Sequence, residues 1–437
     1  MGRDPSRYLF VLACAILVFA YGIAVGLYRI FPFNELQFAK QSVEQLLFDD
    51  EALMIMRPVG HVSPARYEGS GVVRHDPALA APGVTLLAAF HKGGNGLRLI
   101  GPEGNVINYW PVNYRDIWGD SRHIEPSSER PATDWNVDIE SVLALPDGSV
   151  IFSFGQGGLV KMDRCGELEW KVPRMTHHSI ERAEGGGFWV PGRRYVTGKS
   201  EFPPLITPYF EEQILRISED GKVLQEISLP GLFYKNGMQA ILLASGKGVV
   251  ANTDPELTHL NDVEELTSEL AQQFPQFAAG DLIVSMRDFN LVLIMDPRTE
   301  KIKWYQTGPW LRQHDPDFHS DGRIFVFNNN RDDTEDGSIL GGSNIIALDP
   351  KDRSHSIVYG ADDGQKFFTN GGGRFQILDN GNLLITEKSG GRLIEVTQNG
   401  EMAWEFINRY DDDLVVGITQ AIRYPTDYFQ VEDWTCN

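Results

Sequence analysis

From residue 80 onward, apolar and polar positions alternate in short runs separated by turns that end in glycine. The pattern is clearest in residues 141–170 and returns in residues 375–404, and each copy has four apolar runs that end near a tryptophan. Asp147-Gly148 and Asn380-Gly381 stand between alternating runs, and such pairs are strong signals for tight β-hairpins. Each copy therefore predicts one four-stranded antiparallel unit.

The units can be counted by the position that closes the fourth run. This position recurs at Trp110, Trp170, Gln225, Trp304, Tyr359 and Trp404. Six units over residues 84–408 are about 54 residues each, close to the length of propeller blades with their loops. We therefore predict an all-β fold in which residues 84–430 form a six-bladed β-propeller. Residues 421–429 are expected to supply a ring-closing strand, residues 431–437 a tail, and residues 263–274 a helix inside the fourth unit.

The first 28 residues follow a different pattern. Residues 8–28 carry no charge and are long enough, as a helix, to cross a hydrocarbon core of about 30 Å. We predict one N-terminal transmembrane helix there, between a cytoplasmic segment 1–7 and a region 29–83 with a juxtamembrane helix at 34–49 and a linker. A cleaved signal peptide and a lipoprotein are the alternatives. Arg3 and Arg7 favour a cytoplasmic N-terminus, which would place the propeller on the periplasmic side of the inner membrane.

Composition and charge narrow the possible functions. The chain has 437 residues, of which 42% are hydrophobic and 11% aromatic, so it can bury a large core and is not a disordered protein. The formal net charge is −21 without a basic run, which argues against nucleic acid as a partner. Three cysteines cannot form a disulfide framework, and whether Cys165 and Cys436 pair stays open.

The repeats also indicate where chemistry would gather, because the innermost strand of every blade lines the propeller axis. Eight residues before the hairpin glycines Gly186 and Gly322 stand His178 and His314, so we expect both histidines in one central funnel. Corresponding positions in two other blades are Glu140 and Gly373, the latter beside Arg374. In the fourth blade the strand that opens with His259 takes the inner place and is followed across its turn by Arg287. If the register of this strand were shifted by one residue, His177 would face the funnel in place of His178.

The residues around these positions resemble the bacterial arylsulfate sulfotransferase family. The resemblance covers residues 84–430 and is carried by motifs in a similar order: Thr176-His177-His178, His259-Leu260-Asn261, Ser285-Met286-Arg287, Gln313-His314-Asp315, the run from Asn380 to Glu387 and the run from Gly400 to Trp404. It implies a six-bladed propeller that acts outside the cytoplasm. It also implies transfer of a sulfuryl group from an aryl sulfate to a phenolic acceptor without a nucleotide sulfate donor.

The resemblance further implies roles for single residues. His314 would be the nucleophile that forms a sulfohistidine, and His178, His259 and Arg287 would hold the sulfate and polarise the phenolic oxygens. The substrate-binding candidates are Arg374, Asn261 and His177. This chemistry is coherent because a neutral imidazole is a good nucleophile and the arginine fork suits an oxyanion. The scheme needs neither a metal nor another cofactor.

Two other functions stay open, because a fold does not determine a reaction. Glu140 and Gly373 occupy inner positions where cationic or polar groups would help to hold a sulfate. If the propeller has kept its fold but lost the reaction, the chain would be a non-catalytic accessory or scaffold subunit of a membrane complex, with partner proteins that the sequence does not name. Binding of a ligand in the funnel without turnover is the third possibility.

Overall fold

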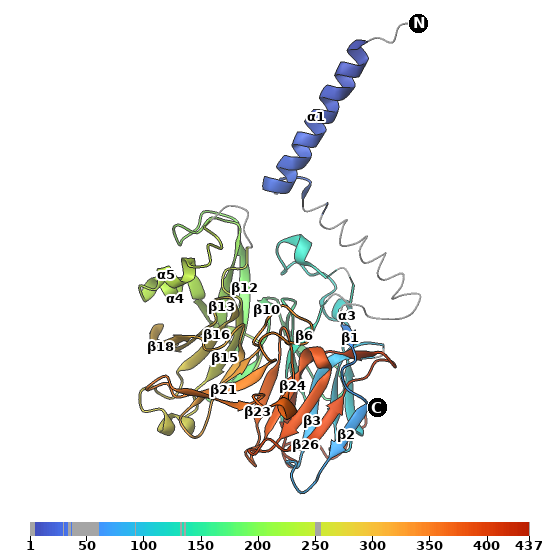
Figure 1. Cartoon of the computed structure of the whole chain (residues 1–437), viewed down its shortest axis with the longest axis vertical. Coiled ribbons are helices and arrows are strands. Elements are labelled where there is room, and N and C mark those ends of the chain that lie inside the picture. Colours follow the sequence, from blue (N-terminus) through green and yellow to red (C-terminus); the bar gives the residue numbers. More distant parts are fainter. Residues whose placement is uncertain are drawn as a thin grey trace.

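The computed structural model describes residues 5–28, 30–33, 36, 61–91, 93–131, 133–134, 137–249 and 255–436. Six antiparallel sheets of four or five strands are arranged around a central axis, so the predicted six-bladed β-propeller is confirmed (Figure 1). The predicted juxtamembrane helix at 34–49 falls almost wholly outside the described residues.

The strands of each blade run outward from the axis and, apart from β28 and β2, follow one another along the chain. The first three blades consist of β28 (Ile418–Tyr424), β3 (Val84–His91), β4 (Gly94–Ile100) and β5 (Val106–Pro111); β6 (Ile139–Ala144), β7 (Val150–Phe154), β8 (Gly158–Met162) and β9 (Leu168–Val172); and β10 (Met175–Thr176) with β11 (Glu181–Arg182), β12 (Phe188–Val196), β13 (Tyr209–Ile217) and β14 (Val223–Ser228). The other three consist of β15 (Leu260–Glu265), β16 (Leu282–Met286), β17 (Leu291–Asp296) and β18 (Lys301–Thr307); β19 (His314–Phe318), β20 (Ile324–Asn328), β21 (Asn344–Leu348) and β22 (His355–Tyr359); and β23 (Arg374–Ile377), β24 (Leu383–Glu387), β25 (Arg392–Val396), β26 (Met402–Ile407) and β2 (Gly71–His75).

Strands from both ends of the propeller sequence close the ring. The C-terminal strand β28 pairs with β3 and forms the innermost strand of the first blade. The N-terminal strand β2 pairs with β26 and adds a fifth strand to the last blade, so residues before Val84 also contribute to the sheets. A separate pair joins β1 (Val62–Pro64) to β27 (Leu414–Val416). Ring closure removes most of the exposed sheet edges of the blades.

The residues that close the fourth runs connect neighbouring blades. All six of these residues lie on the fourth strand of a blade, as predicted. Several donate a side-chain hydrogen bond to a backbone carbonyl in the turn before the fourth strand of the next blade: Trp110 to Asp163 at 2.9 Å, Trp170 to Glu219 at 3.0 Å, Gln225 to Pro297 at 2.7 Å and Trp404 to Pro102 at 2.8 Å. The repeat in the sequence is therefore also a repeat of contacts.

The core consists of layers between blades. One layer joins Leu97 and Trp110 of the first blade to Phe152 and Val160 of the second, and all four side chains are buried. Other buried clusters connect other neighbouring blades in the same way. Because each sheet is covered by its neighbours on both faces, the strands read as nearly continuous apolar runs.

Among the described residues after 61, the short helices are α3 (Tyr114–Trp118), α4 (Leu229–Lys235) and α5 (Gln239–Leu243), with 3-10 turns at η1 (Ser127–Glu129), η2 (Leu270–Gln273), η3 (Arg287–Phe289), η4 (Asp363–Gln365) and η5 (Lys388–Gly390). These helices lie in the connections between blades, whereas η2, η3 and η5 lie in turns within a blade. The predicted helix over residues 263–274 is wrong. β15 continues through Glu265 because Val263 pairs with Val284 in the inner hairpin, and only the turn η2 follows.

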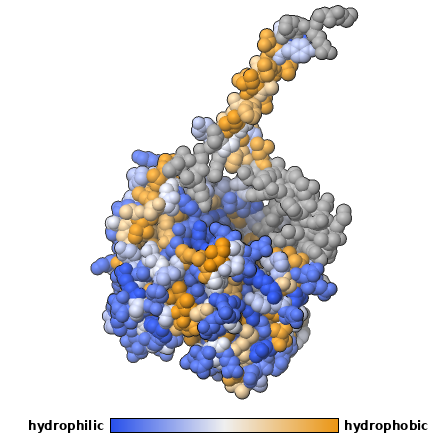
Figure 2. All heavy atoms as spheres, viewed as in Figure 1, coloured by the Kyte–Doolittle hydropathy of each residue, from blue (hydrophilic) through white to orange (hydrophobic). Residues whose placement is uncertain are grey.

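The N-terminal helix α1 (Pro5–Tyr28) has the length and composition of a membrane span over Ser6–Gly26, and only 6% of this window is buried. Apolar side chains cover α1, whereas the visible face of the propeller is mostly hydrophilic (Figure 2). A signal sequence would have the same features.

The two cysteines of the propeller region form a disulfide. Cys165, in the turn between β8 and β9, is bonded to Cys436 near the C-terminus, with 5.6 Å between the Cα atoms. The bond ties the tail after the closing strand β28 to the second blade. The pairing that the sequence left open is therefore present.

Candidate functional site

The ends of the inner strands converge on one cavity. His314 and Arg374 are the first residues of β19 and β23, His259 directly precedes β15, and His178 lies in the break between β10 and β11. These four residues and Arg287 all line a cavity of about 330 Å³. The structure thus brings together side chains from four blades that counting along the repeats had placed in one funnel.

The backbone is irregular where these side chains enter the cavity. His178 and His259 have φ angles of 57° and 54°, in the left-handed region that residues other than glycine rarely adopt. A register shift between His314 and Pro316 leaves Asp315 unpaired in the ladder, with a φ of 51°. Such bulges redirect side chains at the end of a strand and are common beside functional sites.

Hydrogen bonds determine which nitrogen of His314 carries its proton. The Asn329 side-chain amide donates to the carbonyls of Thr369 at 3.0 Å and Gly372 at 2.7 Å, so its oxygen is left as the acceptor. That oxygen lies 2.6 Å from His314 Nδ1. The proton is therefore on Nδ1 and the lone pair on Nε2, toward which the Gly372 N–H points at 3.3 Å. Burial lowers the pKa of His314 well below its usual value and keeps the ring neutral.

Three histidines form a chain that ends at a carboxylate. Glu256 Oε2 lies 2.8 Å from His259 Nδ1, His259 Nε2 lies 3.2 Å from His178 Nε2, and His178 Nδ1 lies 2.9 Å from His177 Nδ1. Burial acts to raise the pKa of Glu256, but its bond with His259 lowers that pKa to about 2, so the carboxylate is ionised. Burial also lowers the pKa of His178, and it brings that of His177 to about 3. The hydrogen-bond pattern that fits these distances has Nδ1–H of His259 donating to Glu256, Nε2–H of His178 donating to His259 and Nδ1–H of His177 donating to His178.

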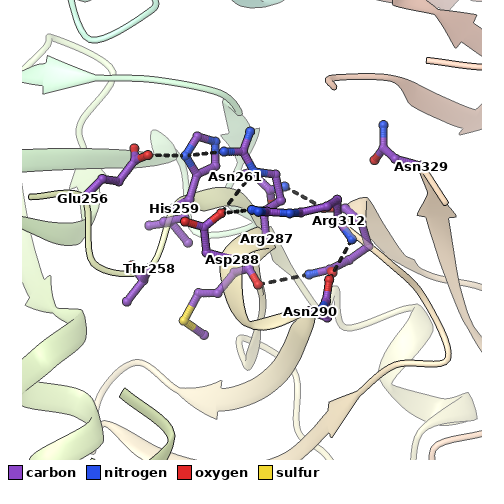
Figure 3. Close-up of polar contacts among 12 residues, drawn as sticks. Glu256, Thr258, His259, Asn261, Arg287, Asp288, Asn290, Arg312 and Asn329 are labelled. Carbon is purple, nitrogen blue, oxygen red and sulfur yellow. Dashed lines mark hydrogen bonds and ion pairs between the residues drawn. The ribbon is translucent and has the colours of Figure 1, made fainter. Parts of the chain in front are cut away.

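Arg287 is held beside this chain by a second carboxylate. Its Nε atom lies 3.4 Å from Asp288 Oδ1, and its Nη2 atom lies 3.1 Å from His259 Nδ1, which can accept from Arg287 only when it does not donate to Glu256 (Figure 3). Asp288 also pairs with Arg312 and Lys247. Burial raises the pKa of Asp288, but Lys247 and Arg287 lower it below its usual value. The Arg287 guanidinium thus lies at the cavity wall and belongs to a group of three cationic side chains that pair with Asp288.

Arg374 lines the cavity but is occupied by carboxylates. It donates to Asp315 at 2.7 Å, to Asp262 at 3.3 Å and to the His178 carbonyl at 3.0 Å. Three further carboxyl groups lie close to Asp315 and Asp262, and they belong to Glu181, Glu264 and Asp317. Burial and mutual repulsion raise the pKa values of this group, to about 8 for Glu181 and about 7 for Asp262. Arg374 therefore balances negative charge along the axis.

The remaining candidates lie behind the cavity wall. The Asn261 amide donates to the Gln313 carbonyl at 2.6 Å, and neither Asn261 nor His177 is among the cavity-lining residues. Glu140 does line the cavity, where it accepts the His178 backbone N–H at 2.7 Å. Burial raises the pKa of Glu140 above its usual value, which reduces its repulsion of an anionic ligand.

Several residues of the site were missed from the sequence, some behind the cavity wall and some lining the cavity. Asn329 follows the strand β20 in the blade of His314, and Glu256 lies in the long connection between the third and fourth blades. The segment 370–372, which the count along the repeats did not include, lines the cavity, as do His61, Asp138 and Lys388. For Asn329, the sequence feature that could have indicated a role is the run Asn328-Asn329-Asn330 at the end of an apolar strand. Within the described ranges no three His, Cys, Asp or Glu side chains are arranged to hold a metal.

Comparisons with known proteins agree with the motifs. A family described as arylsulfotransferase (ASST) matches residues 137–409, more than half of the chain. None of the curated proteins matches significantly. Among solved structures, a protein of unknown function from Bacteroides caccae has 13% identity and a TM-score of 0.49, covering 78% of this chain and 99% of its own. A catalytically inactive virginiamycin B lyase from Staphylococcus aureus has 12% identity and a TM-score of 0.40, covering 79% and 88%. Nothing about the reaction of this chain follows from such distant likenesses.

Proposed function

The chain belongs to the arylsulfotransferase family, and we propose that it transfers a sulfuryl group from an aryl sulfate to a phenolic acceptor through a sulfohistidine on His314. The observation that carries this proposal is the neutral His314 ring in the cavity, with its proton held on Nδ1 by Asn329 and its lone pair on Nε2. A buried neutral imidazole with a fixed tautomer is prepared for nucleophilic attack.

In the first half of the reaction, the Nε2 lone pair attacks the sulfur of the aryl sulfate. The N–S bond forms, the bond between sulfur and the phenolic oxygen breaks, and its electron pair leaves with the phenolate. The imidazole becomes cationic, and its Nδ1–H stays bonded to Asn329 at 2.6 Å. Splitting the transfer at a covalent intermediate replaces one difficult step by two easier ones.

Arg287 and His178 are suited to hold the sulfuryl oxygens. Arg287 is oriented by Asp288, and its guanidinium fork matches the geometry of an oxyanion. His178 carries its proton on Nε2 in the chain of histidines, so it can exchange its bond to His259 for a bond to a sulfuryl oxygen. His259, which is held by Glu256, would then keep the side chains of His178 and Arg287 in position.

In the second half, an acceptor phenol takes the place of the departed phenol. Its oxygen attacks the sulfur, the N–S bond breaks, and the electron pair returns to His314 Nε2. The phenolic proton must leave with this step, so a base is needed beside the acceptor. No group other than the chain's own side chains is required for either half.

We also propose that α1 remains as a membrane anchor, with the propeller on the periplasmic side of the inner membrane. The apolar, mostly exposed helix supports this placement, and so does the bond between Cys165 and Cys436, since disulfides persist in oxidising compartments. Protease digestion of intact spheroplasts, followed by mass measurement of the membrane-bound fragment, tests both the anchor and its orientation. A mature chain that begins after Tyr28 would contradict the anchor.

The reaction is tested with the full chain in mild detergent, an aryl sulfate that releases a coloured phenol, and a phenolic acceptor. We expect transfer by the wild type and a modified peptide containing His314 after donor is added alone. His314→Ala should abolish both, whereas His75→Ala, a change on the outer strand β2, should preserve both. Absence of transfer across a panel of donors, together with a defined protein complex in mild detergent, would favour the accessory-subunit alternative.

A further inference from the structure

A run of glycines borders the cavity beside the proposed nucleophile. Asn370, Gly371, Gly372 and Gly373 all line the cavity that contains His314. The Gly372 N–H points to His314 Nε2 at a distance of 3.3 Å. Gly372 and Gly373 have φ angles of 68° and 92°, in the left-handed region that glycine adopts readily. The backbone of this segment therefore lies within reach of a group that is bound to Nε2.

Residues behind the cavity wall hold the carbonyl groups of this segment. Asn329 donates to the carbonyls of Thr369 at 3.0 Å and Gly372 at 2.7 Å, and the Thr369 hydroxyl donates to the Gly371 carbonyl at 2.9 Å. Neither Asn329 nor Thr369 lines the cavity. The C=O and N–H groups of a planar trans peptide point in opposite directions. The N–H groups of the residues that follow Thr369 and Gly372 therefore point away from Asn329, to the cavity side of the segment.

Most N–H groups of the segment have no protein acceptor. Within the part of the chain that the structure describes, the N–H groups of Asn370, Gly371 and Gly373 donate to no oxygen or nitrogen, and the Gly372 N–H meets only His314 Nε2. Backbone N–H groups are strong donors that are normally paired. Successive N–H groups of such a turn form a nest, which is a concave site for an anion.

A second run of three glycines has a different arrangement. Residues 185–187 lie in the turn between β11 and β12, outside the cavity lining. There the Gly186 N–H donates to the Ala183 carbonyl at 2.9 Å, and the Gly187 N–H donates to Glu219 Oε1 at 2.7 Å. That run therefore uses its donors within the protein, whereas the run at the cavity wall leaves them to a ligand.

We propose that the N–H groups of residues 371–373 form the oxyanion hole for the transferring sulfuryl group, an assignment that rests on the sulfotransfer reaction proposed above. In the resting site, the Gly372 N–H meets the lone pair of His314 Nε2. When this lone pair forms the N–S bond, the N–H loses its acceptor, and the sulfuryl oxygens beside it take over that role. Backbone dipoles that are already aimed at the developing charge stabilise it without rearrangement.

The assignment accounts for a glycine at an inner position of the repeat. Gly373 corresponds to His178 and His314 of other blades. A Cβ atom at Gly373 would lie 2.5 Å from the Phe327 ring, so no side chain fits there. The blade contributes backbone donors at this position, and these hold an anion without adding a titratable group beside His314.

The test uses the full chain in mild detergent, with inorganic sulfate as the probe and hydrogen exchange measured by mass spectrometry. An N–H that gains an acceptor exchanges more slowly, so sulfate should slow exchange in peptides that cover residues 369–375 by about 10-fold or more. Peptides that cover residues 184–188, with the matched glycine run, should not change, and chloride at equal ionic strength should slow neither. If sulfate leaves exchange of residues 369–375 unchanged, the proposal is overturned, whether or not side chains such as Arg287 bind the anion.

Thr369→Val gives a second readout. It removes the hydroxyl that holds the Gly371 carbonyl, so the peptide between Gly371 and Gly372 can turn. We expect release of the first phenol to slow by about 10-fold or more, with an unchanged KM for the acceptor, and protection by sulfate to be lost. Thr369→Ser keeps the hydroxyl and should recover most of both effects. Slower release with sulfate protection intact would mean that Thr369 acts through something other than these N–H groups, which contradicts the assignment.

Failure of the sulfotransfer proposal would be distinguishable. Protection of residues 369–375 by sulfate, in a chain that transfers nothing from any aryl sulfate, would support the anion site and reject the reaction. Transfer without protection of these amides would reject the oxyanion hole alone.

Discussion

His314 Nδ1 lies 2.6 Å from the side-chain oxygen of Asn329, and the Asn329 amide nitrogen is anchored by two backbone carbonyls on the other side. An asparagine held in this way cannot turn over without losing both anchoring bonds. The tautomer of the proposed nucleophile is therefore set by a neutral side chain that does not itself line the cavity, together with the Arg312 carbonyl at 3.1 Å from the same nitrogen.

Asn329→Ala should slow formation of the sulfohistidine, because the Nδ1 proton loses its nearer acceptor and keeps only the Arg312 carbonyl at 3.1 Å, so the ring is held less firmly in the tautomer with a lone pair on Nε2. We expect about 10²-fold slower release of the first phenol, by analogy with other nucleophile and base pairs that lose an orienting group. Rapid-mixing measurement of the first turnover reports this step. Asn399→Ala, on an exposed hairpin turn, is the control. An unchanged first turnover in Asn329→Ala would show that the tautomer does not depend on this contact.

Glu256→Gln should weaken binding of the aryl sulfate. Gln can either accept a hydrogen bond from His259 Nδ1 or donate one to it, so the protons along His259 and His178 are no longer directed one way. We expect about a 10-fold loss in kcat/KM for the donor, similar to other changes of residues that orient a ligating histidine. Steady-state kinetics at saturating acceptor measure it, with exposed Glu269→Gln as the matched variant. Equal kinetics of Glu256→Gln and wild type would refute the directed chain.

The propeller could be predicted because each blade repeats a local pattern. Strand alternation and hairpin glycines are set by neighbours within one blade, and closing residues such as Trp110 and Trp404 repeat the same contact with the next blade. The shared register of His178 and His314 follows from the same repeat. Asn329 and Glu256 instead lie in connections with no repeating pattern, and their roles depend on how those connections cross the cavity. His61 precedes every unit that could be aligned, so no count along the repeats reaches it.

The disulfide should stabilise the closed ring. Cys165 and Cys436 are separated by 271 residues, so their bond restricts a large part of the unfolded chain, and it holds the tail behind β28. Replacing both with serine should cost about 2–5 kcal/mol of the free energy of unfolding and lower Tm in a calorimetric scan. Cys14→Ser, in α1, should leave Tm unchanged. Three reactive thiols in the denatured, unreduced wild type would contradict the bond.

The buried carboxyls along the axis should make the propeller less stable as pH rises. The pKa of Glu181 is raised to about 8 and that of Asp262 to about 7, first by burial and then by neighbouring carboxylates, although Arg374 acts against this. Each group binds its proton more tightly in the folded than in the unfolded chain. Its stabilising effect is complete below the unfolded pKa near 4 and is lost as pH rises through the folded pKa.

Tm should accordingly fall between about pH 5 and pH 8, and Glu181→Gln should reduce this fall because an amide cannot ionise in the enclosed site. The variant should therefore be more stable than the wild type at pH 8 and nearly equal to it at pH 5. Glu184→Gln, three residues along and fully exposed, should leave the slope unchanged. A parallel shift of Tm at both pH values in Glu181→Gln would mean that packing of the new amide, and not the proton, determines the effect.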